Sequence, residues 1–141
     1  MRTKFKKQMK EGVRASNSAT KMSALIAEYA SDYINLGKTT EERQNFLNGA
    51  CTAWNIANLA DHLRDTALQQ IAQTYKKVNP GIADADVENY LHDMKILIQK
   101  KLRMFPHIRK TLLSASIEPI DDTHYWVRVF STDQPEALRK Y

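Results

Sequence analysis

The stretch FLNGACTAWNIANL, residues 46–59, is the most apolar part of this sequence. No Asp, Glu, Lys or Arg occurs between Arg43 and Asp61, and apolar residues cover most of the circumference when the stretch is drawn as a helix. A helix that is apolar on nearly every side is a buried helix. We therefore predict a central helix around which the other elements pack, with Trp54 among the most buried side chains.

The overall composition is that of one soluble globular domain. The chain has 141 residues, of which 43% are hydrophobic and 26% are charged, and both fractions are ordinary for such a domain. Gly and Pro number four each, and this scarcity favours long helices over many turns. The single cysteine, Cys51, excludes a disulfide within this chain. It lies in the most apolar stretch, so we expect a small buried residue.

The net charge of +5 comes entirely from the N-terminal end. Residues 1–14 carry six bases against the single acid Glu11, and the remaining residues carry 15 bases and 15 acids. The six bases are Arg2, Lys4, Lys6, Lys7, Lys10 and Arg14. The sequence therefore predicts a basic arm over residues 1–15 attached to a formally neutral domain.

Apolar spacing and cap residues predict the helices. A first helix is expected over 18–36, with Gly37 following its end. Thr39 and Glu42 fit a capping box at the start of the central helix. A single helix over 40–77 would span about 57 Å, long for a domain of this size, so we predict two helices with a break near 60–65. Asn-Pro-Gly at 79–81 ends the second, and a last helix follows over 84–105.

The pattern changes to strands after Pro106. Apolar residues alternate with serines over 113–117, and the run from Thr123 to Phe130 is rich in β-branched and aromatic residues. We predict an antiparallel hairpin over 108–131 with one outer edge free, which invites strand addition. The predicted fold is mainly α, an irregular bundle of four or five helices with a C-terminal β-hairpin.

These patterns predict how the chain divides into segments and in which cellular compartment it is found. The basic arm covers residues 1–15, a single helical domain with its hairpin covers 16–131, and a tail covers 132–141. The longest uncharged run, 44–60, is shorter than the roughly 20 apolar residues of a membrane-spanning helix. The N-terminus lacks the apolar stretch of a signal peptide, so we expect a cytoplasmic protein.

The motifs of common catalytic and metal sites are absent from the sequence. There is no Cys-x-x-Cys, no His-Glu-x-x-His and no glycine-rich phosphate loop, so we expect no cofactor. A polar group at the predicted helix break, Asp61, His62 and Asp65, is a weak candidate for a metal or acid–base site, and the favoured interpretation is helix caps and a surface ion pair. No nucleophile and base converge in the sequence, which argues against an enzyme.

A second basic cluster could bind phosphates together with the arm. It consists of Lys95, Lys100, Lys101, Arg103, Arg109 and Lys110. The alternative is that these side chains complement the dipole of the last helix or extend along it. Tyr125, Trp126 and Phe130 lie on two faces of the predicted hairpin, so at most one row could stack on bases.

Two functions fit these features. The first is a small intracellular, non-enzymatic adaptor or regulatory module that contacts a protein partner or a second copy of itself, with dimerisation possible through the hairpin edge. The second is a nucleic-acid-binding module that uses the basic arm and the second basic cluster.

Overall fold

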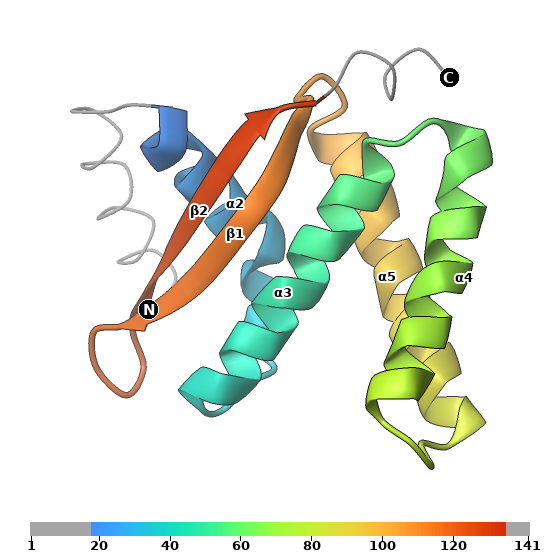
Figure 1. Ribbon diagram of the computed structural model, residues 1–141. Helices are drawn as coiled ribbons and strands as arrows, with labels where there is room; N and C mark the ends of the chain where they lie inside the picture. Colours follow the sequence, from blue (N-terminus) through green and yellow to red (C-terminus); the bar gives the residue numbers. More distant parts are fainter. Residues whose placement is uncertain (1–17, 135–141) are drawn as a thin grey trace. The chain divides into compact units, whose positions relative to one another are not determined.

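The computed structural model describes residues 18–134 and confirms the predicted fold class (Figure 1). Its helices are α2 (Ser18–Ile34), α3 (Thr40–Ala57), α4 (Asp61–Val78) and α5 (Asp84–Met104). The strands β1 (Lys110–Pro119) and β2 (Tyr125–Asp133) form a two-stranded hairpin at the C-terminal end. The basic arm and residues 135–141 of the predicted tail lie outside the described residues, and the single domain over 16–131 stays a prediction.

The capping box at the start of α3 is confirmed in one of its two hydrogen bonds, and the second goes to the amide one residue before Thr39. Thr39 Oγ1 accepts a hydrogen bond from the backbone amide of Glu42 at 3.1 Å, and Glu42 Oε1 accepts one from the amide of Lys38 at 2.8 Å. Gly37 precedes the box and is not in the left-handed conformation, which among the described glycines only Gly81 adopts. A Cβ on Gly37 would lie 2.7 Å from the backbone nitrogen of Arg43. Glycine is therefore required there because the two backbone segments approach closely.

The predicted break between two helices is confirmed, but it is shorter and earlier than expected. α3 ends at Ala57 and α4 begins at Asp61, so the polar residues assigned to the break form the first turn of α4. The Arg64 guanidinium causes this sharp corner. It donates to the carbonyl oxygens of Leu59 and Ala57, at 3.0 and 3.1 Å, and thereby satisfies acceptors at the end of α3.

The internal contacts divide the chain into two compact units. Among the described residues, unit 1 comprises 18–52 and 111–132, and unit 2 comprises 53–110 and 133–134. α3 runs through both units, since its residues 40–52 belong to the first and 53–57 to the second.

Unit 1 has a core built from α2, the first part of α3 and the hairpin. Ile26, Tyr29 and Ile34 of α2 are fully buried, as is Leu47 of α3, and Val129 of β2 is fully buried too. These residues follow the helical and alternating spacings seen in the sequence. The aromatic rings of Tyr33 and Phe46 meet edge to face at 4.8 Å and extend the contact between the two helices.

Unit 2 has its core where α5 meets the end of α3. Trp54 is fully buried, as predicted, and its ring lies 5.8 Å from that of Phe105. Met94 of α5 is also fully buried. α4 runs beside α5 (Figure 1), and Leu68, which is 9% exposed, is its one buried residue. Other apolar residues of α4, Leu63, Ile71 and Tyr75, are only half-buried.

Candidate functional site

The hairpin presents one buried face and one exposed face. Residues 125, 127 and 129 of β2 are buried in the core of unit 1, and the alternate residues Trp126, Arg128 and Phe130 lie on the opposite side. Trp126 is half-buried, whereas Arg128 and Phe130 are exposed. Together with Leu113 and Glu118 of β1, these three residues define what we call the outer face.

One extra residue in β1 brings Leu113 onto the outer face. The Ile120 amide donates to the His124 carbonyl, and the Gln134 amide donates to the Arg109 carbonyl. Between these two pairs β1 advances eleven positions while β2 advances ten. The surplus residue is a β-bulge, and the consecutive exposed residues at 113 and 114 mark its place. Leu113 consequently lies opposite Phe130.

Both edges of the hairpin are covered where they face helices. On the β2 edge, the Ser23 hydroxyl accepts from the Val129 amide at 2.9 Å and donates to the Val129 carbonyl at 3.5 Å. On the β1 edge, Gln44 Nε2 donates to the Ala115 carbonyl at 3.0 Å and Gln44 Oε1 accepts from the Ile117 amide at 2.8 Å. The predicted free edge is therefore wrong at these positions. A strand added to β1 would have to displace the Gln44 amide.

The outer face combines exposed apolar groups with one surface ion pair. Leu113 is 64% exposed and Phe130 is 53% exposed, and the two are opposite each other. Arg128 Nε lies 3.2 Å from Glu118 Oε1 beside them. Exposed ion pairs of this kind contribute little to stability, so neither side chain is needed to hold the hairpin. The two exposed apolar side chains give this face of the sheet a small apolar area.

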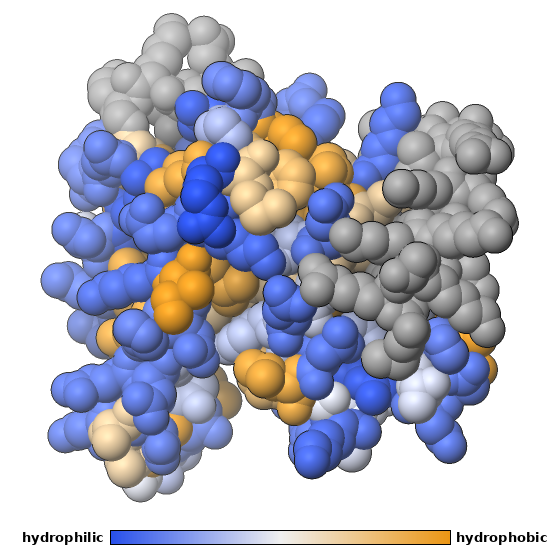
Figure 2. Space-filling view, turned by 180° about the vertical axis from the view of Figure 1, so that it is seen from behind, coloured by the Kyte–Doolittle hydropathy of each residue, from blue (hydrophilic) through white to orange (hydrophobic). Residues whose placement is uncertain are grey.

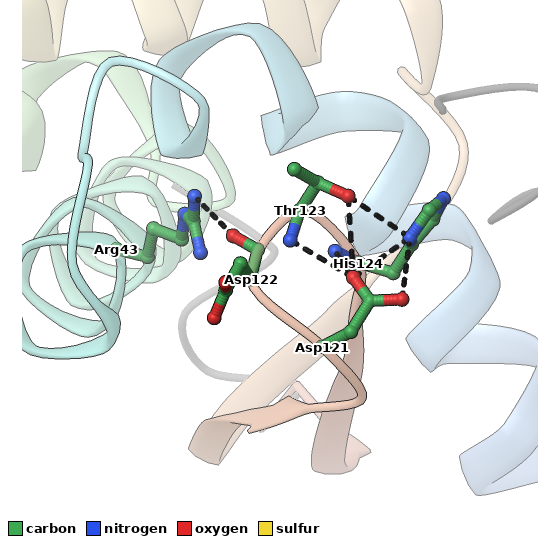
Figure 3. A network of polar contacts seen from close by, with 5 residues as sticks. All are labelled: Arg43, Asp121, Asp122, Thr123 and His124. Carbon is green, nitrogen blue, oxygen red and sulfur yellow. Dashed lines mark hydrogen bonds and ion pairs between the residues drawn. The ribbon is translucent and has the colours of Figure 1, made fainter.

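The loop between the strands is fixed by the carboxylate of Asp121 (Figure 3). Asp121 Oδ1 accepts from the backbone amides of Thr123 and His124, at 2.9 and 2.8 Å, and lies 2.9 Å from His124 Nδ1. The hydrogen bond from the Thr123 amide is the largest cause holding the pKa of Asp121 well below its usual range, and the His124 ring adds to it. A carboxylate that is this fully occupied organises a turn and is a poor proton donor or acceptor.

Arg43 ties this loop to α3 within unit 1. Its guanidinium donates to the carbonyl of Asp122 at 3.5 Å (Figure 3) and lies 5.5 Å from the centre of the Tyr125 ring. The Tyr125 hydroxyl in turn donates to Asn35 Oδ1 at 2.6 Å. The loop end of the hairpin is therefore held against α2 and α3 by charged and polar contacts.

Unit 2 contains a buried amine at its centre. Lys101 is only 1% exposed, and its Nζ donates to Asn58 Oδ1 at 2.6 Å and to the Ile108 carbonyl at 2.8 Å. The Lys110 carbonyl accepts from both Trp54 Nε1 and Asn58 Nδ2, each at 2.9 Å. These bonds join the end of α3, α5 and the start of β1, so the role of Lys101 is to connect elements of the fold.

The surroundings of Lys101 destabilise its charged form and so lower the pKa of its amine. Burial is the largest cause that lowers its pKa from 10.5 to about 8, and the nearby cations Arg109 and Arg64 lower it further. The amine also lies 5.0 Å from the centre of the Trp54 ring. A neutral amine has two N–H groups, and two oxygen acceptors are supplied. Because the amine is enclosed, it is not placed to attack or deprotonate a ligand at the surface.

The second basic cluster is only partly available to a ligand. Lys101 is buried, which removes it from the predicted phosphate-binding residues, and Lys110 Nζ pairs with Asp133 Oδ1 at 2.6 Å. Arg103 and Arg109 are exposed and Lys100 is half-buried. The bases of the arm, Arg2, Lys4, Lys6, Lys7, Lys10 and Arg14, lie outside the described residues.

The polar group at the start of α4 is exposed and does not converge on a site. Asp61 pairs with Arg64 at 2.6 Å, and the side chains of His62 and Asp65 lie at the surface of α4. Among residues 18–134, no three His, Cys, Asp or Glu side chains are arranged to hold a metal ion. The arrangement matches the expected surface ion pair at a helix start.

Cys51 lacks the environment of a reactive thiol. Burial raises its pKa to about 12, and a nucleophilic cysteine needs a lowered pKa. Burial also raises the pKa of the neighbouring Tyr29 hydroxyl. Tyr29 is fully buried in the core of unit 1, whereas Cys51 is half-buried and not the fully buried residue that the sequence predicted.

The surface visible in Figure 2 is mainly hydrophilic, and its hydrophobic residues form small areas separated by polar ones. Scattered apolar residues of this kind are ordinary for a protein surface. Within the described part of the chain, no helix is long and apolar enough to cross a membrane. Comparisons with protein-family models, with curated proteins and with solved structures found no match.

Proposed function

We propose that this protein is a small non-enzymatic adaptor or regulatory module that binds a protein partner through the outer face of its hairpin. The observation that carries the proposal is the exposure of Leu113 and Phe130 opposite each other. The polar clusters described above, around Asp121 and around Lys101, have their hydrogen bonds directed within the chain, which supports a binding role over a catalytic one.

The dimensions of the outer face favour an amphipathic helix as the bound element. Two strands lie about 4.8 Å apart, and a helix with its side chains is about 10 Å in diameter, so the hairpin accommodates one helix. Arg128 and Glu118 flank the apolar pair and are available to polar groups at the rim of such a contact. Strand addition is disfavoured, because Gln44 and Ser23 occupy backbone groups at the edges.

Site-specific photo-crosslinking in cells that naturally produce the protein tests this proposal. A photoreactive phenylalanine analogue replaces Phe130 in one version and Leu36 in another. Leu36 is a matched control because it is apolar, 62% exposed and also part of unit 1. The proposal predicts a discrete protein adduct from position 130 and none from position 36. Equal labelling at both positions, or no protein adduct at 130, would refute it.

Nucleic-acid binding is the second candidate, and the row Trp126, Arg128 and Phe130 favours it. Aromatic rings with an interleaved arginine are typical of surfaces on which single-stranded bases stack. The measurement is the affinity for a fluorescent oligonucleotide over a range of salt, with and without residues 1–14. Loss of the six bases should reduce the slope of the logarithm of the binding constant against the logarithm of the salt concentration by several units. Binding that is unaffected by salt or by the truncation would exclude this candidate.

A further inference from the structure

Asn58 is the centre of a buried hydrogen-bond cluster in unit 2. Its side chain is 1% exposed, and its Nδ2 donates to the Lys110 carbonyl at 2.9 Å. Its Oδ1 accepts from Lys101 Nζ at 2.6 Å, and its backbone carbonyl accepts from Gln134 Nε2 at 2.5 Å. Lys101 and Gln134 therefore contact the same residue, and the amine and the amide are close neighbours.

Two groups in this cluster have fewer partners than their chemistry allows. A protonated lysine amine has three N–H donors, and Lys101 Nζ has two acceptors, Asn58 Oδ1 and the Ile108 carbonyl. Gln134 is 2% exposed, and its Oε1 accepts no hydrogen bond. Among the described residues, this is the one buried side-chain oxygen of unit 2 without a donor. The unused acceptor thus belongs to the same cluster as an amine that gains a third donor on protonation.

The charged groups around the amine do not supply another acceptor. Arg109 and Arg64 act on Lys101 as like charges, and residues 53–58, which end α3, include no ionisable side chain. The two ion pairs beside the cluster are each closed at 2.6 Å and join Arg64 to Asp61 and Lys110 to Asp133. Gln134 Oε1 is therefore the acceptor that unit 2 offers to a third N–H of the amine.

We propose that Lys101 and Gln134 form a proton-dependent clasp that holds the end of β2 to the end of α3. When the amine takes a proton from the solvent, its third N–H donates to Gln134 Oε1. When the amine releases that proton, Gln134 keeps the bond from its Nε2 to the Asn58 carbonyl and the bond from its backbone amide to the Arg109 carbonyl. The clasp then has one hydrogen bond fewer, and this inference does not depend on the proposed function.

The observed arrangement is that of the open clasp. A neutral amine has two N–H groups, which the two acceptors of Lys101 satisfy. A buried carbonyl oxygen without a donor destabilises a fold, so protonation removes one defect while it introduces a buried charge. Burial brings the pKa of the amine to about 8. Both forms are therefore populated near neutral pH, and the clasp responds to modest changes of pH.

An NMR titration of the full-length chain tests the clasp. The Cε resonance of Lys101 reports protonation of its own amine, and Lys101→Met identifies that resonance. Gln134→Leu removes the proposed acceptor, whereas Gln134→Glu replaces it with a carboxylate. Thr132→Val is the matched control, because Thr132 is an exposed residue two positions before Gln134.

The clasp predicts that Gln134→Leu weakens proton binding by the amine about tenfold, which is one pKa unit, and that Gln134→Glu strengthens it. Thr132→Val should leave it unchanged. In the unaltered chain the side-chain amide resonances of Gln134 should titrate together with Lys101 Cε, and Lys101→Met should abolish that titration. Unchanged proton binding in a folded Gln134→Leu variant would overturn the proposal. If that variant does not fold, a Gln134 amide that fails to titrate in the unaltered chain overturns it instead.

Discussion

Raising the pH from 7.5 to 9.5 is expected to stabilise unit 2 through the buried amine of Lys101. The pKa of this amine is about 8 in the folded chain and 10.5 in its ordinary state. Between these values the unfolded chain still holds the proton while the folded chain has released it. Stability rises with pH wherever the unfolded state binds more protons, so the free energy of unfolding should increase over this window.

The expected magnitude follows from the two pKa values. A difference of one pKa unit between the folded and unfolded chains corresponds to about 1.4 kcal/mol of unfolding free energy. The pH range from 7.5 to 9.5 covers only part of the interval between the two pKa values of Lys101. Integration of the proton binding over that range gives an increase of about 2 kcal/mol. In the folded state the neutral amine retains its two bonds, to Asn58 Oδ1 and the Ile108 carbonyl, so deprotonation does not remove the contacts.

Denaturant unfolding at several pH values measures this effect, and Lys101→Met isolates it. Subtracting the unfolding free energies of the variant cancels the titration of all other groups, including Tyr29, whose raised pKa acts in the opposite direction above pH 10. Lys95→Met is the control, because Lys95 is exposed on the same helix. Parallel pH profiles for the unaltered chain and Lys101→Met would refute the reasoning about a neutral amine.

Three further predictions concern single residues. Trp54→Ala should lower the unfolding free energy by roughly 3–5 kcal/mol, whereas Phe130→Ala at the surface should change it by no more than about 0.5 kcal/mol in a denaturant titration. Gln44→Ala should expose the β1 edge and increase self-association in sedimentation velocity, and the same result from Asn45→Ala, at an exposed neighbouring position, would contradict an edge-specific role. Cys51 should react slowly with a disulfide reagent at pH 8 in the folded chain and quickly in denaturant, because its pKa is about 12 when folded.

Local signals in the sequence were sufficient for most of the fold. The cap formed by Thr39 and Glu42, the stop at 79–81 and the alternation in β2 each depend on neighbouring residues, and each is present in the structure. The exact corner between α3 and α4 was not predictable, because it depends on Arg64 reaching back to the Ala57 carbonyl. The spacing of apolar residues does not predict that a long polar side chain will donate hydrogen bonds to the carbonyl groups at the end of the preceding helix.

The polar clusters were harder to predict, although one signal was present. Lys101 was assigned to a solvated basic end, yet it lies seven positions after the buried Met94 and four after the buried Leu97, on the same side of α5. Gln134 was assigned to a loose tail and is buried, with its amide donating to the Asn58 carbonyl. Asn58 and Lys101 are far apart in sequence, so their pairing could be found only from the fold.

The most direct measurement of the central claim is the affinity of the captured partner for variants of the outer face. Leu113→Ser with Phe130→Ser removes both exposed apolar groups, and Leu36→Ser is the matched control. Central apolar residues of an interface commonly contribute more than 1 kcal/mol each, so the double variant should bind at least about tenfold more weakly at an unchanged melting temperature. Equal affinity for the double variant and the control would show that the partner binds elsewhere.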